Sequence, residues 1–127
     1  MNKELSFLAK DDVKKVCSVV VEELKNYKAL KVRLQNKKEQ CEKGIEGDLF
    51  PKLIDNEQRN ELKVIQIDRA LENSLDDTER KIIEMKYLSK ERQNDLNIYL
   101  ELGIQKTPYY ELKKTAIIKI AISLGII

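Results

Sequence analysis

The sequence predicts an all-α protein in which a long N-terminal helix and a second helix pack with a C-terminal domain of shorter helices. Apolar residues recur at helical spacing through most of the 127-residue chain, as in helices that are buried on one side. Only four glycines and two prolines interrupt this pattern, and 36% of the residues are charged while 6% are aromatic. We therefore expect an N-terminal helical region over residues 1–74 and a C-terminal domain over residues 75–127.

The amino-acid composition limits the classes of function that the protein can have. The 24 Lys and Arg residues nearly balance 22 Asp and Glu residues, for a net charge of +2, so only a local group of charges can attract nucleic acid. The chain has no histidine and two cysteines, Cys17 and Cys41, which we interpret as small apolar residues because they lack partners at metal-ligand spacing. The sequence indicates neither a signal peptide nor a membrane-spanning run. We expect a cytoplasmic protein without a metal, a cofactor or enzyme activity.

The N-terminal helix is expected to begin at Asp11, where acidic residues suit the positive end of the helix dipole. Residues 1–10 form a lead-in, with Phe7 and Leu8 available for packing. The helix then carries an apolar seam of about three heptads, which is long enough to bury against a helix of the same chain or of a second copy. The seam consists of Val13, Cys17, Val20, Leu24, Tyr27 and Leu34.

Beyond Leu34 the helical pattern fades, and glycines and Pro51 mark a connection. Its apolar residues predict that the connection folds back onto the protein; they are Ile45, Leu49, Phe50, Leu53 and Ile54. A second helix is expected from Asn56 to about Asn73. Its broad apolar face suits contact with both the first helix and the C-terminal domain; that face consists of Leu62, Val64, Ile65, Ile67, Ala70 and Leu71.

A third helix follows an acidic cluster. Asp76 is a predicted N-cap and Glu79, three residues later, is placed to reach back to it as in a capping box. This helix has a predicted buried side that consists of Ile82, Ile83, Tyr87 and Leu88. A polar loop over residues 89–93 then leads to Asn94.

Residues 94–120 have the outline of a helix-turn-helix. Two helical apolar patterns, Leu96/Ile98/Leu102 and Tyr109/Leu112/Ala116/Ile120, flank a short break. Gly103 in this break tolerates positive φ, and Ile104 supplies an apolar plug between the helices. Asn94 and Gln105 occupy the N-cap positions. Pro108 falls in the first turn of the second helix. Backbone N–H groups in the first turn have no acceptor within the helix, so the N–H that proline lacks is not needed there.

The register of this second helix predicts which side chains are open to a ligand. If its apolar residues face the core, the remaining side is rich in lysine and also carries threonine and tyrosine. Lysine neutralises phosphate, threonine and tyrosine bond to bases or backbone, and a glutamate can accept from cytosine N4. The predicted DNA-binding residues are Lys106, Thr107, Tyr110, Glu111, Lys113 and Lys114.

The segment over residues 75–126 resembles region 4 of bacterial sigma factors. More closely, the chain resembles the ArpU family of phage transcriptional regulators, which is related to the RinA group. The motif residues are LDDTERKIIEMKYL, the Leu-Gly-Ile turn, the Tyr109-Tyr110 pair and Lys113-Lys114, with a shorter N-terminal match at LKNYKALK. This resemblance implies a sigma region 4-like helix-turn-helix on double-stranded promoter DNA, and a phage or prophage activator of late genes for packaging, morphogenesis and lysis in a bacterial cytoplasm.

Other interpretations remain open. The chain is alternatively an adaptor that binds RNA polymerase or another phage protein through the N-terminal seam, or a packaging-DNA binder like small terminase subunits. An enzyme would need the acidic cluster Asp76/Asp77/Glu79 or the pair Glu84 and Lys86 to hold a metal, whereas caps and charged helix faces explain both. Since one helix-turn-helix offers few phosphate contacts, we also expect a homodimer or a complex with polymerase.

Overall fold

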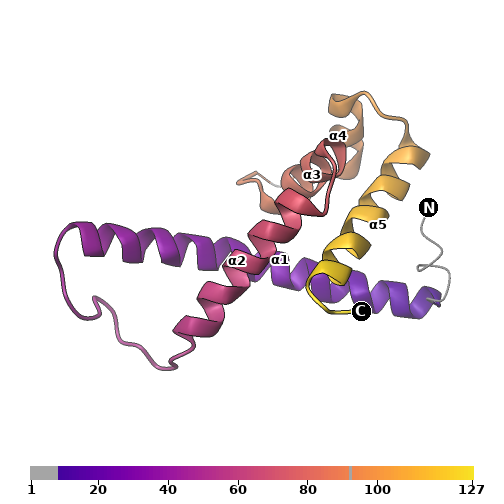
Figure 1. The fold of residues 1–127 in the computed structure, drawn as a ribbon. Coiled ribbons are helices and arrows are strands. Elements are labelled where there is room, and N and C mark those ends of the chain that lie inside the picture. Colours follow the sequence, from indigo (N-terminus) through magenta and orange to yellow (C-terminus); the bar gives the residue numbers. More distant parts are fainter. Residues whose placement is uncertain (1–8, 92) are drawn as a thin grey trace.

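The computed structural model describes residues 9–91 and 93–127, and these residues are helical with no strands (Figure 1). The expectations for Phe7, Leu8 and position 92 of the polar loop lie outside the described residues. The elements are α1 (Lys10–Glu42), α2 (Glu57–Asn73), α3 (Asp77–Ile83), the π-helix η2 (Glu84–Leu88), α4 (Asp95–Leu102) and α5 (Lys106–Ser123). The prediction of an all-α protein is therefore confirmed for the described residues. None of their helices is both long and apolar enough to span a bilayer.

Helix α1 spans 33 residues and is longer than its apolar seam suggested. Beyond Leu34 it continues to Glu42, because lysine, glutamine and glutamate are good helix formers even on a solvated surface. Gly44, at a φ of 68°, follows its end. The prediction that helical structure fades after Leu34 was therefore wrong by about two turns.

One core joins the N-terminal and C-terminal parts of the chain. In Figure 1 α2 crosses α1, and the C-terminal part of α5 meets the N-terminal half of α1 at a steep angle. Val20, Leu24 and Tyr27 of the seam are 5% exposed or less and share this core with α2, α3 and α5. Val13, Cys17 and Leu34 are only partly buried, whereas Val16, which the predicted seam omitted, is 7% exposed. The central seam thus packs against the same chain.

The core residues of α2 lie in the middle of its predicted apolar face. Val64, Ile67, Ala70 and Leu71 are buried, and α2 contacts both α1 and α5, as the width of the face predicted. Leu62 and Ile65 are about half exposed, at 55% and 49%, so their assignment to the core was wrong. The buried residues form a single narrow stripe along α2, because α1 and α5 cover this helix from one side only.

The connection over residues 43–56 does not fold back onto the core. It leaves the helices at the lower left of Figure 1. Phe50, Leu53 and Ile54 are 81%, 94% and 71% exposed. Their hydrophobicity was a poor guide here, because the connection extends away from the core. Lys37 pairs with Glu57 and Glu61 where the end of α1 and the start of α2 come together. Cys41 next to it is also exposed, which corrects its interpretation as a small apolar residue.

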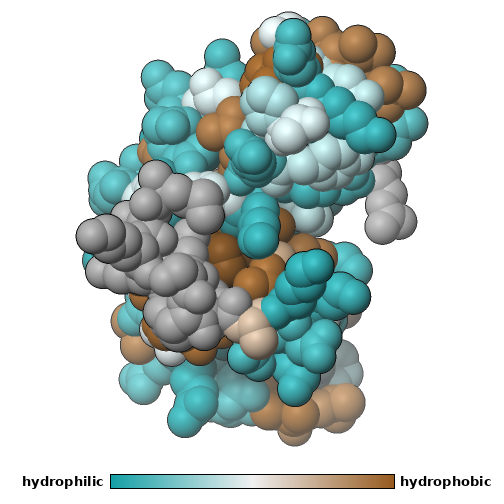
Figure 2. Space-filling view, turned by 90° about the vertical axis from the view of Figure 1, so that its right-hand side faces the viewer, coloured by the Kyte–Doolittle hydropathy of each residue, from teal (hydrophilic) through white to brown (hydrophobic). Residues whose placement is uncertain are grey.

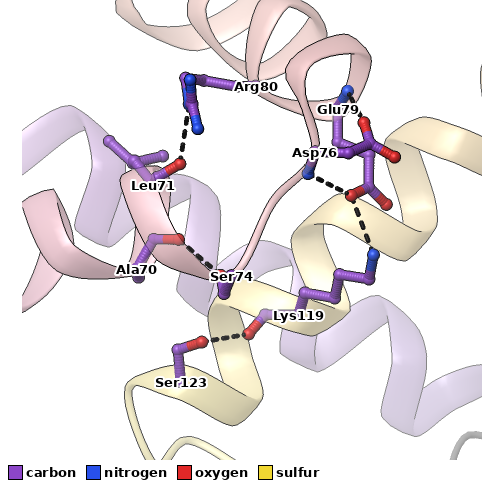
Figure 3. A network of polar contacts seen from close by, with 8 residues as sticks. All are labelled: Ala70, Leu71, Ser74, Asp76, Glu79, Arg80, Lys119 and Ser123. Atoms are coloured by element: carbon purple, nitrogen blue, oxygen red, sulfur yellow. Dashed lines mark hydrogen bonds and ion pairs between the residues drawn. The ribbon is translucent and has the colours of Figure 1, made fainter.

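The start of α3 is held by the predicted capping box. The Glu79 N–H donates to Asp76 Oδ1 at 2.7 Å, and the Asp76 N–H donates to Glu79 Oε1 at 2.9 Å (Figure 3). The predicted third helix then changes character, because the Ser89 N–H bonds to the Glu84 carbonyl five residues earlier, which is a π-type turn. Ile82 and Ile83 are fully buried, but Tyr87 and Leu88 in this wider turn are only partly buried.

Candidate nucleic-acid interface

Helices α4 and α5 are placed by local signals that the sequence contains. The Asn94 side chain accepts from the Asn97 N–H at 2.8 Å and caps α4. Gly103, at a φ of 69°, ends α4 in the left-handed conformation that a side chain would disfavour. Gln105 occupies the N-cap position of α5 without a side-chain cap bond, and Pro108 lies in the first turn. The predicted start and end of α4 and the predicted start of α5 are therefore confirmed.

A small second core fixes the two helices to α3. Ile82, Ile98 and Tyr109 are fully buried in it, and partly buried residues including Ile104 and Leu112 pack against it. Ile104 thus occupies the plug position that the sequence predicted. Leu96, in contrast, is 51% exposed, so its assignment to the buried side of α4 was wrong.

Helix α5 has two halves with different surroundings. From Ala116 to Ala121 its apolar side chains are each 3% exposed or less, and they cover an arc of about 200° around the helix. Before Ala116, Tyr109 is the only fully buried side chain among the described residues of the helix. The second half therefore anchors the helix in the core and the first half presents a free side.

Five of the six predicted DNA-binding residues lie on this free side. At 3.6 residues per turn they fall within an arc of about 140°. Helix α5 begins in the upper part of the molecule in Figure 1. In Figure 2 hydrophilic and intermediate side chains lie across the upper part of the visible face, with hydrophobic ones along its top edge. The exposed residues are Lys106, Thr107, Tyr110, Glu111 and Lys114.

The chemistry of this side suits an anion. The first turn of α5 contains no acidic residue and its N-cap makes no side-chain bond, so its backbone N–H groups and the helix dipole favour negative charge. Lys106 and Lys114 add two cations about two turns apart. Tyr110 is 40% exposed and stands edge-on to Tyr109, with ring centroids 5.2 Å apart. Its ring is thus oriented by the core beneath it.

Lys113 is the exception, and its assignment to the open side was wrong. Its side chain is only 17% exposed, and its Nζ lies 3.0 Å from Asp95 Oδ1 on α4. Asp95 also accepts from the Tyr109 hydroxyl at 2.6 Å and lies 3.6 Å from Lys86 Nζ. Lys113 lies 4.9 Å from the Tyr110 ring centroid as well. It is therefore part of the joint between α4 and α5.

Asp95 is the residue of this region that sequence reasoning missed. An acidic residue in the first turn of a helix is common because of the helix dipole. The position of Asp95 in the sequence therefore gave no sign that its side chain also binds residues of another helix. Burial alone raises the pKa of the Asp95 carboxyl, but bonds from Tyr109 and Lys113 and the charges of Lys113 and Lys86 lower it below its ordinary value. The same burial and the bond to Asp95 raise the pKa of Tyr109.

This lowered pKa predicts a pH dependence of stability. The carboxylate contributes stability that is present above the unfolded-state pKa of about 4 and is lost as pH falls through the lower folded value. Hence Asp95→Asn should destabilise the protein at neutral pH, and the difference from wild type should shrink below about pH 4. Urea denaturation across this range measures it. Glu101→Gln, at an exposed position of α4, should follow the wild type at every pH; a difference for Asp95→Asn that stays constant into acid would contradict the prediction.

The acidic residues considered for a metal have other roles. Asp76 and Glu79 form the capping box, Glu79 also pairs with Lys119, and Lys86 lies near Asp95. Over residues 9–91 and 93–127, no three His, Cys, Asp or Glu side chains gather as metal ligands would. Cys17 is partly buried, and burial raises the pKa of its thiol although Lys114 and Lys113 oppose this.

Comparisons with protein-family models, curated proteins and solved structures found no match to this chain.

Proposed function

We propose that this chain is a DNA-binding transcriptional regulator that reads promoter DNA with the first half of α5. The observation that carries the proposal is the exposed group Lys106, Thr107, Tyr110, Glu111 and Lys114, on a helix whose second half is anchored in the core. A helix-turn-helix reads the major groove with the N-terminal residues of its second helix. The α4 and α5 pair, joined at Gly103, has the connection that such a unit requires.

The resemblance to sigma region 4 and to ArpU regulators supports a more specific role. In this proposal the protein is a phage or prophage activator of late genes that acts in the cytoplasm of a bacterial host. Lys106 and Lys114 contact phosphates, while Thr107, Tyr110 and Glu111 face base edges. The net charge of +2 gives little long-range attraction, so affinity should depend on this local group and fall steeply with salt.

The first test is fluorescence anisotropy of the purified chain against promoter-region DNA of its own genome and a scrambled duplex, over a salt series. Tight binding that depends on sequence and has a steep salt slope supports the proposal. Packaging-site DNA as a third duplex separates a promoter regulator from a terminase-like binder. Equal weak binding to all three would contradict sequence reading by α5 alone and would favour an adaptor of RNA polymerase or of another phage protein.

Two neighbouring lysines give a matched pair of variants. Lys114→Ala should weaken binding to all duplexes and lower the salt slope by about one unit, because it removes one phosphate contact. Lys113→Ala should leave the slope unchanged, because Lys113 is held by Asp95. Tyr110→Ala should reduce the preference for promoter over scrambled DNA. If Lys113→Ala lowers the slope as much as Lys114→Ala does, the assignment of the binding side is wrong.

The small number of cations on α5 also makes a second half-site necessary for specific binding. Between Lys106 and Lys119 there are four lysines, of which Lys113 and Lys119 pair with Asp95 and Glu79. In this proposal two copies, or one copy with polymerase, occupy adjacent sites. The central seam of α1 is buried within the chain, so a second copy must use another surface.

A further inference from the structure

Two surfaces of this chain complement each other but do not meet within one molecule. The first is the exposed part of the connection between α1 and α2, residues 45–55, which we name the apolar loop. Its large side chains are 47% to 94% exposed; they are Ile45, Leu49, Phe50, Leu53 and Ile54. Apolar side chains that gather at one exposed segment are typical of an interaction site.

The second surface is an open groove of about 580 Å³ between α1 and η2. Its apolar floor consists of Tyr27, Val32, Met85 and Leu88. The π-type turn of η2 helps to shape this groove, because it carries Met85 and Leu88 past α1. Val32 is 55% exposed. Flexible Met and branched residues of this kind accommodate apolar side chains from a partner.

The charges of the two surfaces are opposite. The apolar loop contains three acidic residues and one lysine over residues 45–55. The α1 segment that borders the groove, residues 25–38, contains six basic residues and no acidic one. Lys31 pairs with Asp68, and Lys37 pairs with Glu57 and Glu61, so four of the six form no ion pair among the described residues. Lys28 and Lys31 of this segment line the groove directly, with Glu84 opposite them. An acidic apolar segment therefore fits the groove better than a basic one does.

The apolar loop of the same chain does not reach this groove. Lys37 pairs with Glu57 and lies 2.7 Å from Glu61, which closes the base of the connection, and Gln40 bonds to the Gly47 carbonyl. At 1.5 Å per residue, the straight helix between the groove and the start of the connection spans about 20 Å. A two-fold axis that passes midway between the groove and the apolar loop, perpendicular to the line that joins them, exchanges their positions and so brings each apolar loop to the groove of the other copy.

We propose that the chain forms a two-fold dimer in which the apolar loop of each copy inserts Phe50 and its apolar neighbours into the groove of the other. Such a dimer does not add further copies, because both loops and both grooves are already occupied. Pro51 limits the conformations of the loop and so reduces the entropy lost on insertion. The dimer contact does not depend on DNA, while it supplies the second α5 that the proposed function needs.

Sedimentation equilibrium without nucleic acid tests this dimer. The loop variant Phe50→Ser/Leu53→Ser and the groove variant Val32→Glu change exposed residues, so each should keep the wild-type circular dichroism. Each should weaken self-association by roughly a hundredfold or more, because two equivalent contacts are lost per dimer. Val19→Glu, at an α1 position that is 46% exposed and outside the groove, should dimerise like wild type.

Mixing the two variants gives the decisive result. The loop variant retains an intact groove and the groove variant retains an intact loop, so together they should form a heterodimer with one intact contact. Sedimentation velocity with one fluorescently labelled variant detects it. A wild-type chain that stays monomeric, a loop variant that still dimerises, or a mixture that stays monomeric would each overturn the proposal. A monomer keeps its own α5, so weak binding of a single copy to DNA would persist in each of these cases, and anisotropy measures it separately from self-association. Specific binding would then need polymerase, in place of a second copy, at the adjacent site.

Discussion

Replacing Tyr109 by alanine is expected to lower the free energy of unfolding by about 3 to 5 kcal/mol, the usual cost of removing a buried aromatic side chain. Tyr109 is fully buried between α3, α4 and α5. Its hydroxyl also donates to Asp95 at 2.6 Å. The change therefore leaves a cavity and removes a bond to a carboxylate at the same place. Urea denaturation followed by circular dichroism measures the loss.

The adjacent tyrosine provides the matched control for this change. Tyr110→Ala should cost less than about 1 kcal/mol, as expected for a surface substitution, because Tyr110 is 40% exposed. Tyr109→Phe keeps the ring but removes the hydroxyl, and should cost about 1.5 kcal/mol. If Tyr109→Ala and Tyr110→Ala are equally destabilising, then Tyr109 does not face the core and the register assigned to α5 is wrong.

Replacing Glu79 by alanine is expected to have the second largest effect, a loss of about 2 to 4 kcal/mol in the free energy of unfolding. Glu79 is 1% exposed and serves two partners at once (Figure 3). It accepts from the Asp76 N–H in the capping box, and Lys119 Nζ lies 2.9 Å from the same oxygen. Removing it breaks one of the two bonds of the capping box, that from the Asp76 N–H, and leaves Lys119 of α5 without its carboxylate. Because Lys119 is 34% exposed and can turn to water, the cost stays below that of a fully buried unpaired charge.

Two further variants separate the roles of Glu79. Glu79→Gln retains a side chain that can complete the capping box but removes the charge, so it should cost less than Glu79→Ala. Asp77→Ala changes the neighbouring carboxylate, which is 92% exposed, and should cost less than about 1 kcal/mol. Thermal or urea denaturation of the three proteins gives the comparison. An equal loss for Asp77→Ala would show that the general charge at the start of α3 matters and not the Lys119 contact.

Much of the candidate site could be predicted because its signals are local. Asn94, Gly103 and Pro108 fix the ends of α4 and α5 through backbone chemistry that depends on neighbouring residues only. The spacing of Tyr109 and Ala116 then determines which side of α5 is buried. The same kind of argument identified Asp76 and Glu79 as a capping box.

Contacts between distant segments were the part that sequence patterns missed. Lys119 interrupts an apolar run, but its partner Glu79 lies 40 residues away, so no local pattern pairs them. The exposure of Phe50 was also unexpected, because hydrophobicity predicts burial only when the backbone brings a residue to a core. The π-type turn at Glu84–Leu88 follows a helical pattern that continues without a break, so nothing local marked it.

Local patterns in the sequence predicted the all-α class, the ends of α2 and α4, the start of α5 and the side of α5 that faces the core. The fold was needed to show that Lys113 pairs with Asp95, that the centre of the α1 seam packs within the chain, and that the apolar loop is exposed. This difference follows from the range of the forces involved. Caps and helical periodicity act between residues a few positions apart, whereas ion pairs and burial depend on which distant helices the fold brings together.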